Sequence, residues 1–234
     1  MKTLKIVGIV FLSFTSFGSI SIAVDDFSFE KEELKQWDYE LADKKSDAEI
    51  EQLKKNFGKY KDFLLKTAAK DYAEVFANND PGIMKRVKEI EKMGSIALDC
   101  SFAENDAEVI LKKREFIRII GQIELTKFER KEDIEKMTDV DEIGKEVGLL
   151  PLTELEYRKK LIKAYLEQIN EHIAKMIAFH EANIIIYQES EMEEMVELSD
   201  ICTFADNRLS FVLEAKKIFL QKKEADRLAG GKVF

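Results

Sequence analysis

The chain has 234 residues, with 37 Lys and Arg against 46 Asp and Glu, a net charge of −9, 45% hydrophobic residues, 2 Cys, 2 His and 2 Pro. This composition is too apolar for a disordered acidic tail, too poor in Pro and Gly for a fibrous or linker sequence, and too poor in Cys for a disulfide-stabilised scaffold. The excess of acids also argues against a general nucleic-acid binder.

Residues 1–23 have the three parts of a secretory signal peptide. Two lysines form a positive start, an apolar stretch runs on to about Ile20, and Ser21 and Ala23 supply the small residues that a signal peptidase recognises. We predict cleavage after Ala23 and an exported protein, either periplasmic or secreted. The alternative is an uncleaved membrane anchor, because the apolar stretch is almost long enough to span a bilayer.

Cleavage there leaves 211 residues with 35 basic and 46 acidic groups. Such a surface is repelled by nucleic-acid phosphates and by anionic lipids unless its basic residues are segregated from its acids. The densest basic run, 112–114 with Arg118, lies close to Glu115 and Glu124 and indicates an ordinary solvated helix face. No later segment approaches about eighteen uncharged apolar residues. We therefore expect no nucleic-acid partner and no stable membrane insertion.

The pattern of the mature sequence is typical of an all-α protein, a bundle of long amphipathic helices. Apolar residues recur at spacings of three and four, and the period-two alternation of strands is absent. We assign 24–45 to an N-terminal helical arm, with a helix at about 30–42, and 46–137 to a first helical unit. In this unit Ser46 and Glu49 predict a capping box before a long helix, and further helices are expected at about 83–98 and 105–137.

Helix breakers gathered over 138–151 predict a hinge or loop before a second helical unit, 152–234. Thr153 and Glu156 predict a second capping box, and a last helix is expected from about Asn207 to Gly230. Alternating spacings of four and three in between predict a coiled-coil seam of Ile162, Leu166, Ile169, Ile173, Met176 and His180. The seam either faces a partner, including a second copy bound through the 152–200 helix, or packs inside the protein.

One six-residue motif occurs twice, 102 residues apart. Residues 100–105 (Cys-Ser-Phe-Ala-Glu-Asn) match residues 202–207 (Cys-Thr-Phe-Ala-Asp-Asn) at four of six positions. The same offset aligns Met93 with Met195, so one interpretation is an internal duplication that gives two similar helical halves. Chance similarity between two amphipathic helices is the other interpretation. In either case Asn105 and Asn207, or the acid before each, can cap the helices that follow them.

The two cysteines occupy the same position of this repeated motif. Because equivalent positions in two packed halves favour pairing in an oxidising space, we predict a disulfide between Cys100 and Cys202. The alternative is two buried free thiols in separate cores.

No catalytic, cofactor-binding or metal-binding motif is recognisable in the sequence. His172 and His180 fit neither the Glu-x-x-His nor the His-Glu-x-x-His pattern of metal-binding helices. We expect His172 at the surface and His180 in the core or facing a partner. The acidic run 189–194 lacks the glycine turn of a calcium-binding loop. We therefore predict no catalytic, metal or cofactor site.

Three functions are compatible with these features. We favour an exported helical binding or scaffold protein, such as an envelope or secretion-apparatus component or a host-directed factor, that acts through protein–protein contacts. The second is a carrier of an apolar small molecule or lipid held between helices, suggested by 16 Phe and 7 Met. The third is an enzyme without a linear motif.

Overall fold

A computed structural model describes residues 28–78, 83–138, 150–184 and 189–228. These residues form helices and short connections, with no strand among them, so the prediction of an all-α bundle is confirmed. The predicted signal peptide, nearly all of the predicted hinge and the predicted helix end at Gly230 lie outside the described residues.

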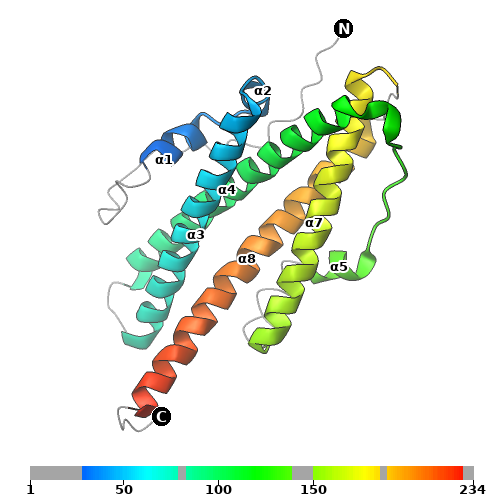
Figure 1. Ribbon diagram of the computed structural model, residues 1–234. Helices are drawn as coiled ribbons and strands as arrows, with labels where there is room; N and C mark the ends of the chain where they lie inside the picture. Colours follow the sequence, from blue (N-terminus) through cyan, green and yellow to red (C-terminus); the bar gives the residue numbers. More distant parts are fainter. Residues whose placement is uncertain (1–27, 79–82, 139–149, 185–188, 229–234) are drawn as a thin grey trace.

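Four long helices make up the bundle, and they form two hairpins (Figure 1). The first hairpin pairs α3 (Asp47–Asn78) with α4 (Ile83–Arg118), and the second pairs α7 (Leu152–Glu181) with α8 (Glu189–Leu228). Helix α3 packs on α8 as well as on α4, and α7 packs on α4 as well as on α8. In Figure 1, α4 and α8 lie between α3 on one side and α7 on the other.

Short elements complete the described chain. Helices α1 (Ser28–Lys35) and α2 (Tyr39–Ala42) precede the first hairpin, while η2 (Ile120–Gln122) and α5 (Glu132–Met137) follow it. The single helix predicted at 30–42 is thus broken in two. The break lies at Asp38, which has an extended backbone and accepts a hydrogen bond from the Leu41 N–H, as an N-cap residue does.

One of the two predicted capping boxes is confirmed. The Glu49 N–H donates to Ser46 Oγ at 3.3 Å, and the Glu49 carboxylate accepts from the Ser46 N–H at 2.8 Å. The box at Thr153 was wrong, because α7 begins one residue earlier, at Leu152. Its first turn is closed by the Glu154 N–H donating to the Pro151 carbonyl.

The repeated motif does not begin helices, as we had expected, but lies inside them. Residues 83–118 form one continuous helix, and α8 begins at Glu189, so neither Asn105 nor Asn207 is a cap. The helix predicted at 105–137 ends at Arg118 instead, and an irregular segment leads from η2 to α5. A polar residue in the middle of a helix needs another partner, and here that partner comes from the other hairpin.

Helices α4 and α8 contact each other through two matching hydrogen bonds between their copies of the motif. Asn105 Nδ2 donates to Thr203 Oγ1 at 2.6 Å, and Asn207 Nδ2 donates to Ser101 Oγ at 2.7 Å. Each hydroxyl in turn donates to the backbone carbonyl four residues earlier on its own helix. The residue numbers run in opposite senses on the two helices, so the contact has an approximate two-fold symmetry.

Alanine occupies the centre of this crossing on both helices. Ala103 is 1% exposed and Ala205 is 0% exposed, and each lies midway between the two polar residues of its own helix. Small side chains allow the two backbones to approach closely enough for short Asn side chains to reach across. The repeated motif therefore encodes the contact between the hairpins.

The hydrophobic core has the same reciprocal arrangement. Val109 of α4 is buried in the main cluster of the second hairpin, whereas Phe211 of α8 packs against the cluster of the first hairpin. These two residues are also 102 positions apart in the sequence. The offset that relates the motifs therefore relates core residues as well, and a duplicated origin of the hairpins stays a hypothesis that this arrangement supports.

Candidate binding cleft

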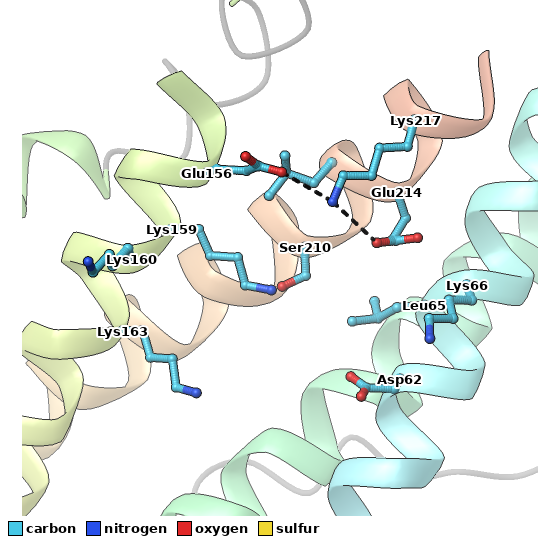
Figure 2. A pocket seen from close by; sticks show the side chains of 11 residues that line it. Asp62, Leu65, Lys66, Glu156, Lys159, Lys160, Lys163, Ser210, Glu214 and Lys217 are labelled. Carbon is cyan, nitrogen blue, oxygen red and sulfur yellow. Dashed lines mark ion pairs between the residues drawn. The ribbon is translucent and has the colours of Figure 1, made fainter. Parts of the chain in front are cut away.

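A cleft with a volume of about 500 Å³ opens between α3, α7 and α8 (Figure 2). It lies at the end of the bundle where α7 begins and α8 approaches its last turns. Its lining consists of Asp62, Leu65, Lys66, Glu156, Lys159, Lys160, Lys163, Ser210, Leu213, Glu214 and Lys217. Eight of these eleven residues are charged, which is unusual for a site that holds an apolar ligand.

The helical repeat of α7 brings its lysines to the cleft. Lys159 and Lys163 are one helical turn apart, and Figure 2 shows both side chains extending from α7 toward α8 and α3. Leu65 and Leu213, both almost fully buried, form the apolar part of the lining. The Ser210 hydroxyl donates to the backbone carbonyl of Asp206 at 2.7 Å.

Most of the lysines in the cleft have no ion-pair partner among the described residues. Lys217 contacts Glu156 at 3.3 Å and Glu214 at 4.0 Å. In contrast, no described carboxylate lies within ion-pair distance of four other lining cations, which are Lys66, Lys159, Lys160 and Lys163. Cations that are close together and not neutralised by the protein's own acids favour an anionic partner.

One carboxyl group lies behind the cleft. Burial raises the pKa of Asp206, and the charges of Lys159, Lys61 and Lys163 oppose that rise. Asp206 Oδ1 is buried without a hydrogen-bond partner among the described residues. This acid therefore offsets part of the positive potential at the inner side of the cleft. The rest of that potential is located at the more exposed ends of the lysine side chains.

The cleft belongs to a larger basic region at one end of the bundle. The helix segments that meet at this end, 59–78, 83–95, 152–163 and 208–228, contain 18 Lys and Arg against 10 Asp and Glu. The opposite segments, 47–58, 96–118, 164–181 and 189–207, contain 7 against 18. The fold therefore brings together basic residues from four distant segments, which no single run of the sequence indicates.

The predicted partner-facing seam is mostly part of the protein's own core. Ile162, Leu166, Ile169, Ile173 and Met176 are all at most 8% exposed and belong to the main cluster with α8. Only His180, at the end of the seam, is partly exposed. The seam is thus not a free surface for a partner or for a second copy of the chain, and the internal alternative is the one found.

The two cysteines are free thiols in the structure, and the predicted disulfide is not formed. Cys100 lies in the cluster of the first hairpin and Cys202 in that of the second. Burial raises the pKa of both thiols, that of Cys202 to about 12. Neither is therefore a reactive nucleophile, because the thiolate is the reactive form.

His172 is buried rather than at the surface, contrary to expectation. It is 8% exposed, its ring lies 5.3 Å from that of Phe128, and burial lowers its pKa. The segment that carries Phe128 covers this face of α7, and the helical pattern of α7 alone gave no sign of such a cover.

Within the described ranges, no group of three or more His, Cys, Asp or Glu side chains is placed to hold a metal ion. Three carboxyl groups do have pKa values shifted toward neutrality by burial. Asp99 and Asp106 reach about 6, and Asp200, which is also close to the charges of Asp106 and Glu197, reaches about 7. None of the three lines the cleft, so they do not form an acid–base pair around a substrate site there.

The lysines of the cleft belong to a basic run that no motif in the sequence analysis included. Arg158, Lys159, Lys160 and Lys163 form a basic run at the start of α7. Such a run is usually a solvated helix face, and only its position opposite α3 and α8 distinguishes it.

None of the helices in the described ranges has a stretch both long and apolar enough to cross a membrane. Comparisons of the chain with protein-family models, with curated proteins and with solved structures find no match.

Proposed function

We propose that this chain is an exported helical binding protein that acts through protein–protein contacts made at the basic end of its bundle. The observation that carries this proposal is the cleft with four lysines for which no described carboxylate lies within ion-pair distance. Unpaired cations raise the local positive potential, attract a partner of opposite charge and speed its encounter. A purely structural helix face is more often neutralised by pairs within the helix, such as Lys175 with Glu171 on the same α7.

The export part of the proposal rests on the sequence of residues 1–23. The test is the intact mass of the protein purified from its native source. We expect a chain that starts at Val24. A full-length mass would contradict export by cleavage and would direct the search for partners to the inside of the cell or to its membrane.

A carrier of an apolar molecule receives no support from a specific contact. The cleft is lined mainly by charged residues, and the two large clusters of the core are filled by the protein's own side chains. An enzyme receives no support from a specific contact either, because the lining serine, Ser210, donates its hydroxyl to the backbone carbonyl of Asp206 rather than to a side chain that could act as its base.

Photo-crosslinking in the native cells tests the binding function. A crosslinking amino acid placed at Lys160 on the cleft rim is compared with one placed at Lys55, which is exposed on the outer face of α3. We expect a protein adduct of constant mass from Lys160 and none from Lys55. If neither position, nor others around the surface, gives a protein adduct, protein binding is not the function.

A further inference from the structure

The N-terminal arm, residues 28–43, packs over the groove between α3 and α4 of the first hairpin. The Trp37 ring packs edge-on against Phe57 of α3 at 5.3 Å, and its indole N–H donates to the Asp106 carboxylate of α4 at 2.9 Å. Lys113 and Arg114 of α4 hold Asp43 and the backbone around it. The arm is acidic, with six Asp and Glu against two Lys over 28–43.

The approximate two-fold symmetry assigns a counterpart to this groove in the second hairpin. Adding 102 to the residue numbers converts Phe57 into Lys159 and Asp106 into Arg208. The place where an aromatic ring and a carboxylate receive the arm thus has two cations in the second hairpin. Lys159 lies in the cleft itself. The same offset relates α1 to α5, which packs on α7, and no residue of α5 lines the cleft.

The ion pairs also differ between the two grooves. In the first hairpin Glu108 neutralises Lys54 at 3.2 Å and Lys112 at 2.9 Å, and Glu104 pairs with Lys61. The counterpart of Glu108 is Ser210, a neutral residue. The counterparts of Lys54 and Lys112 are the acids Glu156 and Glu214, which Lys217 contacts, whereas Lys159 and Lys160 replace the uncharged Phe57 and Gly58. The second groove therefore has cations at two positions where the first groove has none.

From this comparison we infer that the cleft between α3, α7 and α8 binds an acidic helical segment of a partner protein. This inference rests on the proposed function and names the chemistry of the partner. Carboxylates of the segment pair with Lys66, Lys159 and Lys163, in the way that the acidic arm is held by cations of α4. A volume of about 500 Å³ holds a few side chains rather than a whole helix, so the segment lies across the opening and inserts one face.

A labelled helical peptide of Leu-Glu-Glu-Ala repeats is the probe, titrated against the purified protein and followed by fluorescence anisotropy. The same peptide with Gln in place of Glu is the uncharged control. We expect saturable binding of the acidic peptide only, weakened at least about tenfold by K159E/K163E and weakened also by added salt, as for exposed charge pairs. The control variant K55E/K127E has the same charge change at two exposed positions outside the basic end, and it should bind as the wild type does.

Melting curves and circular dichroism establish whether each variant is folded. If K159E/K163E does not fold, K159Q/K163Q removes the same charges without adding acids. The inference is overturned if the acidic peptide does not bind, if both double variants weaken binding equally, or if inorganic polyphosphate or vesicles of phosphatidylglycerol bind at the cleft while the peptide does not. It is also overturned if the protein alone self-associates through the cleft, measured by sedimentation at increasing concentration.

The crosslinking experiment separates this inference from the proposed function. A protein adduct formed from other surface positions, together with no binding of the acidic peptide, would leave the binding function standing and remove the cleft as its site. Peptide binding at the cleft without any protein adduct in cells would leave the cleft chemistry standing and remove the proposed function.

Discussion

The Asn207 side-chain amide donates a hydrogen bond of 2.7 Å to the Ser101 hydroxyl, although the two residues are 106 positions apart in the chain. Both residues are buried, at 8% and 6% exposure. The matching bond from Asn105 to Thr203 completes a polar crossing in an otherwise apolar interface. A buried polar pair is costly to leave unsatisfied, so it favours the one register in which both bonds form.

The crossing predicts a specific loss of stability. Asn207→Ala removes the donor to Ser101 and leaves a space in the interface, and we expect it to lower the free energy of unfolding by about 1–3 kcal/mol. The measurement is equilibrium denaturation in urea. Asn56→Ala is the control, because Asn56 makes only a hydrogen bond within α3, to Gln52, and should cost less than about 0.5 kcal/mol. Equal losses for the two variants would contradict the role of the crossing.

Three half-buried carboxyl groups predict that moderate acid stabilises the protein. Their pKa values, about 6 for Asp99 and Asp106 and about 7 for Asp200, lie above the value of about 3.9 expected in the unfolded chain. A raised pKa in the folded state adds stability that is complete below the unfolded pKa and is lost as pH rises through the folded pKa. We therefore expect a higher melting temperature at about pH 5.5 than at about pH 7.5.

Asp200→Asn tests the source of that pH dependence. The variant cannot ionise, so its melting temperature should change less between those two pH values than that of the wild type. Glu193→Gln, an exposed change on the same helix, is the control and should keep the full pH dependence. A wild-type protein that becomes less stable on acidification through this range would show that these carboxyl groups do not dominate.

The contacts of Trp37, the single tryptophan of the chain, predict how much the arm contributes to stability. Trp37→Phe keeps an aromatic ring beside Phe57 but removes the indole N–H, so the Asp106 carboxylate loses its hydrogen bond. We expect a loss of about 1–3 kcal/mol in the free energy of unfolding at neutral pH, the usual cost of leaving a buried acceptor unpaired. Because protonation removes the charge of Asp106, the loss should shrink as pH falls below about 6. A loss that does not depend on pH would indicate that only ring packing matters.

The free thiols predict the reactivity of the two cysteines. Cys100 and Cys202 are both 0% exposed with raised pKa values, so neither should react with an alkylating reagent in the native protein. Both should react completely after unfolding in the absence of a reductant. The measurement is intact mass after alkylation. Thiols that remain protected in the unfolded protein until a reductant is added would show a disulfide and would contradict the arrangement described above.

Much of the fold could be predicted from local sequence. The spacing of apolar residues predicted helices throughout, and the Ser46 capping box marked the start of α3 correctly because its bonds join residues three positions apart. The 102-residue offset between the two motifs suggested two similar halves, and that interpretation stays a hypothesis. Local pattern did not predict where the helices continue. Asn105 and Asn207 suit an N-cap when only neighbouring residues are considered. They lie inside helices because the opposite helix provides hydrogen-bond partners for their side chains.

Only the tertiary structure decided which surface is available for binding. The sequence by itself determined the helical class, the apolar stripe of α7 and the repeated motif, because each depends on residues close together in the chain. It did not determine that the stripe faces α8 inside the core, or that Lys66, Lys159 and Lys163 surround one cleft. Those facts depend on how two hairpins cross, and the crossing is set by contacts about 100 residues apart.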